Sequence, residues 1–208
     1  TARLTQLDGQ KLDKLDVKTE ADAQAAVTKI MASEAVVTQI ETKRVRRNPQ
    51  PPFTTSTLQQ EASRKLGFSA SRTMQIAQKL YEGINIGRET TGLITYMRTD
   101  GVQLGNEAIA AIRDAISGRF SARYMPDKPR VYKTKAANAQ EAHEAIRPTA
   151  INRDPKEMQA FLDHDQSRLY ELIWKRTIAS QMQSAELDQT GVDITTKTGE
   201  AVLRANGQ

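Results

Sequence analysis

Apolar and polar residues alternate with strand-like spacing near both ends of this chain. Residues 2–17 carry leucines on both sides of Asp8-Gly9, a dipeptide that favours a two-residue hairpin turn. The β-branched run at 35–47 predicts a long strand, and the alternation that resumes at residue 185 predicts a further hairpin. An alanine-rich stretch at 19–33 predicts a helix between the first two elements. Together the two ends predict a strand-rich module.

Between these strands the apolar residues recur every three or four positions, which is typical of amphipathic helices. Ser, Thr, Asn and Asp favour helix starts, and glycine favours helix ends. The first predicted helix starts at Ser56, with Gln59 as a capping box, and ends at Gly67, and the second starts at Ser69 or Ser71 and ends at Gly83. The third runs from Asn106 to Phe120, and the fourth from Ser167 to Met182.

The change of apolar period predicts where one domain gives way to the other. Three prolines within residues 49–52 end the long strand and form a stiff connector. We therefore predict an α+β protein, mainly helical with a strand-rich part. A helical domain at 53–183 is inserted into a discontinuous domain formed by 1–52 and 184–208.

One segment in the middle of the helical part places three functional groups close together. The apolar run at 93–95 predicts a short strand that ends on Tyr96, and if this strand continues, Tyr96, Arg98 and Asp100 would share one face. A free tyrosine has a pKa near 10, and a neighbouring cation favours its phenolate and can bind a phosphate. The segment therefore suits a nucleophilic tyrosine. The alternative is a packing tyrosine next to a surface ion pair.

A second polar segment lies about 45 residues further on. Residues 140–149 are predicted to form a short helical turn that Pro148 ends. His143 and Arg147 are four residues apart, so on a helix they would share a face and could hold a phosphate. An ordinary charged surface turn is the alternative.

Composition is that of a globular protein, with 38% apolar and 26% charged residues among 208. No apolar run is long enough to span a membrane, and the absence of cysteine fits a reducing, cytoplasmic compartment. The first residue is Thr1, so we expect a piece of a longer protein.

The net charge of +5 is concentrated in one stretch, which suggests a polyanionic partner. Residues 43–72 contain seven basic residues and one acid. The two helices joined near Gly67 resemble a helix-turn-helix, and Arg64, Lys65 and Arg72 near the turn are candidate DNA-binding residues. A solvated basic face is the alternative. Asp163-His164-Asp165 could bind a metal, but a polar loop between helices accounts for it, so no metal site is predicted.

Three stretches resemble the type IA DNA topoisomerase family. They are GLITYMRTD at 92–100, PPFTTSTLQQEASRKLGFSASRTMQIAQKLYEG at 51–83, and AQEAHEAIRPT at 139–149. Met97 is typical of the bacterial topoisomerase I branch, whereas the other branch usually has proline at this position. The family usually continues with serine where this chain has Gly101, so a side-chain hydroxyl is missing there.

The resemblance implies a mechanism for the tyrosine. Tyr96 would form a transient 5′-phosphotyrosine bond with single-stranded DNA, allowing strand passage and ATP-independent relaxation of negative supercoils. Arg98 and His143 would be catalytic, and Arg147, Asp100 and Glu144 would support them. The resemblance also implies an arch of strands that carries the helical domain.

The resemblance further implies that catalysis needs parts outside this chain. The family binds Mg²⁺ in a Toprim domain, and the bacterial branch adds a C-terminal zinc-ribbon domain. We therefore expect this fragment to bind single-stranded or negatively supercoiled DNA at the bacterial nucleoid, away from any membrane, without being catalytically complete. A non-catalytic DNA-binding or scaffold module, with Tyr96 stacking on a base, is the alternative.

Overall fold

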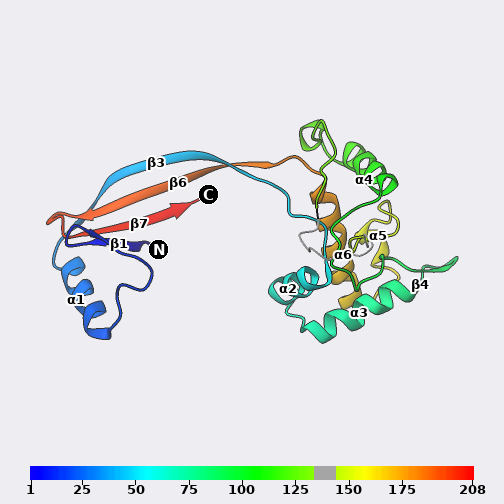
Figure 1. The fold of residues 1–208 in the computed structure, drawn as a ribbon, viewed down its shortest axis with the longest axis horizontal. Coiled ribbons are helices and arrows are strands. Elements are labelled where there is room, and N and C mark those ends of the chain that lie inside the picture. Colours follow the sequence, from blue (N-terminus) through cyan, green and yellow to red (C-terminus); the bar gives the residue numbers. More distant parts are fainter. Residues whose placement is uncertain (134–143) are drawn as a thin grey trace. The chain divides into compact units, whose positions relative to one another are not determined.

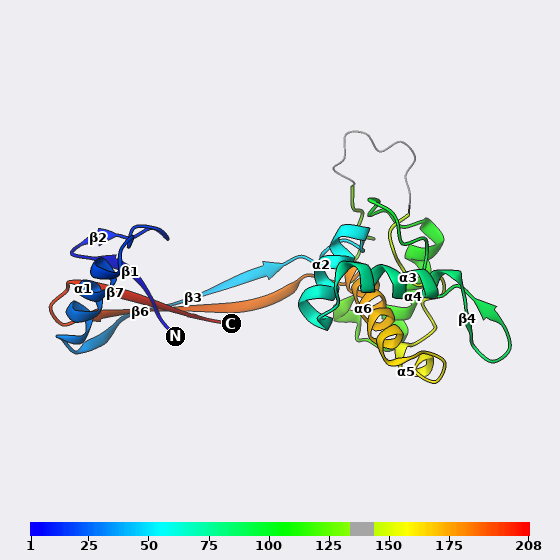
Figure 2. The same cartoon turned by 90° about the horizontal axis from the view of Figure 1, so that it is seen from below.

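The structure is a computed structural model that describes residues 1–133 and 144–208 (Figures 1 and 2). It contains helices and antiparallel sheet, which confirms the predicted α+β class. The chain divides into two compact units, one formed by Thr1–Arg47 with Ala185–Gln208 and the other by Asn48–Ser184. The predicted insertion of a helical domain into a discontinuous strand-rich domain stays a prediction.

A five-stranded antiparallel sheet forms most of the first unit, with the strand order β2-β1-β7-β6-β3 (Figure 1). Its strands are β1 Arg3–Leu7, β2 Gln10–Lys11, β3 Ala35–Arg47, β6 Ala185–Thr196 and β7 Ala201–Gly207. β3 and β6 pair along their whole lengths, from Ala35 opposite Thr196 to Arg47 opposite Ala185. The predicted long strand and the predicted late hairpin are therefore both present.

The turn and the helix of this unit follow from local sequence. Asp8 and Gly9 both have positive φ, 52° and 77°, as a two-residue hairpin turn that follows strand twist requires. Helix α1, Glu20–Met31, starts at Thr19, whose side chain accepts from the Asp22 amide while Asp22 accepts from the Thr19 amide. Both features match the prediction, although β2 is shorter than expected.

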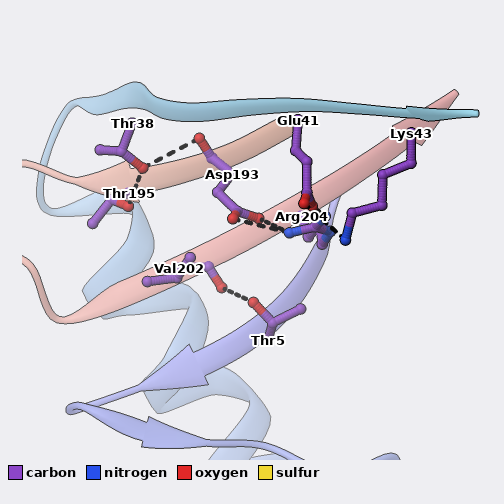
Figure 3. Close-up of polar contacts among 8 residues, drawn as sticks. All are labelled: Thr5, Thr38, Glu41, Lys43, Asp193, Thr195, Val202 and Arg204. Atoms are coloured by element: carbon purple, nitrogen blue, oxygen red, sulfur yellow. Dashed lines mark hydrogen bonds and ion pairs between the residues drawn. The ribbon is translucent and has the colours of Figure 1, made fainter. Parts of the chain in front are cut away.

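Arg204 links three strands of this sheet through ion pairs (Figure 3). Arg204 on β7 donates from Nη1 to both carboxylate oxygens of Asp193 on β6, at 3.0 Å each. Its Nη2 reaches Glu41 on β3 at 3.3 Å, and Lys43 pairs with the same carboxylate at 2.7 Å. Gly191 leaves room for this crossing, since a Cβ there would lie 2.4 Å from Arg204 Nη2 and the guanidinium would have to shift.

The second unit is helical and packs around α6. Its elements are α2 Thr55–Leu66, α3 Ala70–Glu82, β4 Ile84–Asn85, β5 Thr90–Thr91, α4 Asn106–Arg119, the 3₁₀ turn η1 Ala122–Tyr124, α5 Pro155–Met158 and α6 His164–Ser180. Leu169, Tyr170 and Ile173 of α6 are completely buried in the same core as Phe53 and Leu80. This core is the support on which the candidate site rests.

Several predicted helix starts are wrong by a few residues. Helix α2 is capped by Thr54 with Thr57, not by Ser56 with Gln59. Helix α4 has Gly105 as its N-cap, so Asn106 is already helical, and α6 starts at Asp163, one turn before Ser167. Several residues of each stretch can cap a helix, and tertiary packing decides where the chain enters it.

Two connecting segments also differ from the prediction. The sequence predicts a loop at 87–91, but Thr90 and Thr91 form β5, which pairs with β4 directly after α3 (Figure 2). Val131 and Tyr132, whose β-branched and aromatic side chains favour a short strand, are irregular. Tyr132 instead uses its hydroxyl to bond the carbonyls of Pro49 and Ser180, at 3.2 and 2.9 Å, so side-chain anchoring replaces a ladder there.

Candidate active site

The tyrosine segment is not a strand, and its main chain bends at Thr95, Met97 and Arg98. The ladder covers only Thr90–Thr91, and beyond it Ile94 makes a single bridge to Pro148. The short strand predicted at 93–96 is therefore wrong, because only one bridge forms there. Tyr96, Arg98 and Asp100 are exposed while Met97 and Thr99 are buried, and the face that the three polar side chains were predicted to share stays a prediction.

The start of this segment is pinned against the end of α3. Leu93 donates its amide to the Leu80 carbonyl at 2.7 Å, and both side chains are completely buried. Gly92 lies against the next carbonyl, where a Cβ would be only 2.4 Å from the Tyr81 oxygen. A residue without a side chain is needed for this close approach.

Residues 144–149 hold the other side of the segment. Thr95 donates its amide to the Arg147 carbonyl at 2.9 Å, and its hydroxyl donates to the Ala145 carbonyl at 2.7 Å. The Arg147 amide in turn donates to the Thr95 hydroxyl at 3.0 Å. The structure thus brings together the main chains of two signature stretches that are distant in sequence.

The helical turn predicted at 140–149 is wrong for its described part. Glu144, Ile146 and Pro148 make isolated bridges to Gln103, Phe53 and Ile94, as extended residues do. Proline disfavours a helical conformation in the residue before it, and the buried Ala145 and Ile146 anchor the segment in the core. His143 lies outside the described residues, so its role stays a prediction.

A third anchor comes from the first turn of α2. The Thr55 hydroxyl lies 2.8 Å from the Met97 carbonyl and accepts from the Thr99 amide at 2.8 Å. The Thr55 amide donates to the Thr99 carbonyl at 2.9 Å. Thr55 was not predicted as a site residue, because the Thr-Ser-Thr run in the sequence indicates only a helix cap.

Tyr96 projects from this anchored segment into solvent, with 46% of its surface exposed. Its ring meets that of Tyr81 edge to face, with centroids 5.3 Å apart and an interplanar angle of 65°. Such a contact favours a fixed ring position. Tyr81 was also missed from the sequence, since nothing in α3 indicates that the chain returns past its last turn.

Arg98 and Arg147 face different hollows. Arg98 lines an open groove of about 900 Å³ with Arg72 and Lys79 of α3 and His164 of α6. Arg147 is held by Glu144, with Nε and Nη2 at 2.7 and 3.0 Å from its two carboxylate oxygens, and lines the hollows beside α4. The two segments are joined through their main chains, and a shared phosphate site for Tyr96, Arg98, His143 and Arg147 stays a prediction.

The remaining candidate residues have other partners. Arg64 and Lys65 both pair with Glu61, the latter at 2.9 Å, and Arg72 pairs with Asp165 on α6. Arg72 holds the pKa of the Asp165 carboxyl below its usual range, chiefly through this hydrogen bond. Acids thus offset part of the predicted basic surface.

Asp100 makes no ion pair with Arg98 in the described parts of the chain, so the expected orienting contact is absent from this structure. Within residues 1–133 and 144–208, no group of three or more His, Cys, Asp or Glu side chains could hold a metal ion. In the same residues, no helix is long and apolar enough to cross a membrane. Asp163 instead caps α6 through the Gln166 amide.

Comparison with known proteins identifies the family. The sequence profile of the DNA topoisomerase family matches residues 2–208. The chain is 57% identical over 208 residues to DNA topoisomerase 1 of Zymomonas mobilis and 54% identical over 207 residues to that of Rickettsia felis. Both matches cover 100% of this chain, but only 16% of the Zymomonas protein and 27% of the Rickettsia protein.

A solved structure agrees with these relatives. The structure of full-length topoisomerase I from Thermotoga maritima matches with a TM-score of 0.70 and 38% identity, over 92% of this chain and 31% of that one. The profile match, the relatives and the fold all coincide over nearly the whole sequence. This chain belongs to the type IA DNA topoisomerase family.

Proposed function

We propose that this chain supplies the nucleophile of a type IA DNA topoisomerase and that Tyr96 is that nucleophile. The observation that carries the proposal is an exposed tyrosine on a segment anchored by α2, α3 and residues 144–149. A preorganised segment of this kind holds a nucleophile in position without spending binding energy on ordering it.

The proposed reaction is a reversible transesterification on single-stranded DNA. The phenolic oxygen of Tyr96 attacks a backbone phosphorus, a P–O bond to the tyrosine forms, and the bond to the 3′-oxygen breaks. The phenol loses one proton and the leaving 3′-oxygen gains one. The reverse reaction reseals the strand after another strand has passed, so negative supercoils relax without ATP.

Other residues would bind and orient the phosphates. Arg98 is the proposed source of charge stabilisation, an effect typically worth about 3–4 kcal/mol in a transition state. His143 is proposed to hydrogen-bond a phosphate near the cut, with Arg147, held by Glu144, and Asp100 as supporting residues. Arg64, Lys65 and Arg72 are proposed to contact the DNA backbone further away.

The metal of the reaction is proposed to lie outside this chain. The described residues do not fit a Mg²⁺ site, because they offer no cluster of suitable ligands. We assign Mg²⁺ to a Toprim domain in the rest of the longer protein, which together with a C-terminal domain is the proposed intramolecular partner.

A chimaera tests the proposal. This chain replaces its counterpart in the Zymomonas mobilis protein, to which it is 57% identical, and the chimaera is incubated with a single-stranded oligonucleotide. A 3′-end label should become attached to the protein, whereas a 5′-end label should appear on a shorter free strand. Tyr96→Phe should abolish both products and keep oligonucleotide binding.

Tyr124→Phe is the matched control. Tyr124 is also 46% exposed and also touches another aromatic ring, that of Phe120, but lies outside the anchored segment. The chimaera that carries Tyr124→Phe should cleave the oligonucleotide like the unaltered chimaera. An adduct that survives Tyr96→Phe, or a folded chimaera that forms none, contradicts the proposal.

A binding role is the second candidate, and the exposed pair of Tyr96 and Tyr81 favours it as a surface on which bases could stack. In that case the chimaera forms no adduct, Tyr96→Phe keeps full affinity for the oligonucleotide, and Tyr96→Ala loses affinity.

A further inference from the structure

The hydroxyl of Thr55 contacts the main chain on both sides of Arg98. It lies 2.8 Å from the Met97 carbonyl and 3.1 Å from the Thr99 carbonyl, and it accepts from the Thr99 amide at 2.8 Å. A hydroxyl has one proton to donate and can also accept, so it satisfies the Thr99 amide and one of the two carbonyls at a time.

These hydrogen bonds hold the part of the tyrosine segment in which buried and exposed side chains alternate. Met97 and Thr99 are 1% and 8% exposed, so their side chains point inward and Arg98 between them points outward. On the other side of Tyr96, Thr95 is held by residues 145–147. Tyr96 and Arg98 therefore project from a main chain that Thr95 and Thr55 fix at its two ends.

Thr55 is not needed to begin its own helix. Helix α2 is capped by Thr54, whose side chain accepts from the Thr57 amide, while the Thr57 hydroxyl accepts from the Thr54 amide at 2.9 Å. The hydrogen bonds of the Thr55 side chain go to Met97 and Thr99 and to no residue of α2. Removal of this hydroxyl thus acts on the tyrosine segment and leaves the cap intact.

We propose that Thr55 is a positioning residue for the strand-cleavage reaction, acting through the main chain at 97–99 to set the directions of Tyr96 and Arg98. This inference rests on the proposed function. Displacement of a reacting group by about 1 Å can reduce a rate about a hundredfold, so one lost anchor has a measurable effect.

The experiment compares three variants in the same chimaera. Thr55→Val removes the hydroxyl at nearly constant shape, Thr55→Ser keeps it, and Thr57→Val removes an equivalent hydroxyl that serves only the cap of α2. Single-turnover cleavage should fall by about tenfold to a hundredfold for Thr55→Val, with oligonucleotide affinity within about twofold of the unaltered protein. Thr55→Ser and Thr57→Val should cleave at near-normal rates.

Amide hydrogen exchange on the 208-residue chain supplies a readout that does not depend on catalysis. The Thr99 amide should exchange faster in Thr55→Val, which lacks its acceptor, and should keep its protection in Thr57→Val. If Thr55→Val does not fold, Thr55→Cys takes its place, because a thiol of similar size forms weaker hydrogen bonds.

The outcomes separate the two proposals. Cleavage by Thr55→Val at the rate of Thr57→Val, with Tyr96→Phe inactive, overturns the role of Thr55 and leaves the proposed function standing. A fall in affinity that accounts for the whole loss of cleavage also overturns it, since a positioning residue acts on the chemical step. An adduct in Tyr96→Phe overturns the proposed function itself.

Discussion

At the scale of single residues, the candidate site depends on which side chains are kept out of the core. Met97 and Thr99 are buried, so the residues between and beside them, Tyr96, Arg98 and Asp100, must face solvent. This order of exposed and buried side chains needs no sheet, because the bent segment is held by hydrogen bonds to Thr55 and to residues 145–147. Burial of Met97 and Thr99 thus leaves the three polar side chains accessible to solvent.

Gly92 is the residue at which a small change should matter most. In Gly92→Ala, the new Cβ would meet the Tyr81 carbonyl oxygen at 2.4 Å. That oxygen belongs to the main chain and the Cβ is bonded directly to the main chain, so neither atom can move aside easily. We expect the free energy of unfolding to fall by about 1–3 kcal/mol. Urea denaturation measures this change.

Gly118→Ala is the control for that variant. Gly118 lies in α4, and a Cβ there would have nothing within 4 Å. Alanine should stabilise the helix by up to about 0.5–1 kcal/mol. Equal effects of the two substitutions on the free energy of unfolding would show that the close approach to the Tyr81 carbonyl does not require glycine at position 92.

At the scale of elements, the groove beside Arg98 is lined by α3 and by the start of α6. These two helices share the buried core and also an exposed ion pair between Arg72 and Asp165. The Arg72 candidate for DNA binding is therefore already engaged within the protein. A phosphate that binds Arg72 must compete with this carboxylate.

The ion pair predicts a pH-dependent effect of Arg72→Met. The pKa of Asp165 is lowered in the folded state, first by its hydrogen bond with Arg72 and further by the charges of Arg72, His164 and Arg168. A lowered pKa contributes stability above the ordinary carboxyl pKa, and this contribution is lost as the pH falls through the folded value. Arg72→Met should thus lower the melting temperature at neutral pH and change it less in acid.

Carboxyl NMR gives a direct measurement of this prediction. The pKa of Asp165 should rise toward its usual range in Arg72→Met. Lys175→Met removes another exposed partner, that of Glu171 on the same helix, and should leave the titration of Asp165 unchanged. A constant pKa in Arg72→Met would mean that the two side chains do not pair in solution.

At the scale of the whole molecule, a net charge of +5 favours binding to a polyanion. We expect the 208-residue chain alone to bind single-stranded DNA weakly. Because each neutralised phosphate releases counterions, the logarithm of the affinity should fall with the logarithm of salt concentration by about 0.7 per contact. Fluorescence anisotropy at several salt concentrations measures the slope.

The same chain should form no covalent adduct, with or without Mg²⁺. Its described residues offer no metal site, and the relatives that it matches are several times longer. An oligonucleotide labelled at its 3′ end checks this expectation on denaturing gels. An adduct at Tyr96 in this assay would show that the chain is catalytically complete and that our assignment of an essential part of the reaction to another domain is wrong.

The sequence by itself determined the elements whose signals are local. The Asp8-Gly9 turn, the β-branched strand Ala35–Arg47 and the helix end at Gly67 appear where they were predicted, because each depends on conformational preferences of neighbouring residues. The family was likewise readable from the sequence, through its three motifs.

Only the tertiary structure decided how the candidate site is held. The contacts of Thr95 with residues 145–147 and of Thr55 with residues 97–99 join segments about 40 to 50 residues apart, and no local pattern encodes such pairs. Residues 144–149 are extended rather than helical for the same reason, since burial of Ala145 and Ile146 outweighs the local preference of a short polar run. Local preferences are worth tenths of a kcal/mol to about one per residue, whereas burial of a large apolar side chain is worth about 1.5–3 kcal/mol, so packing prevails where the two conflict.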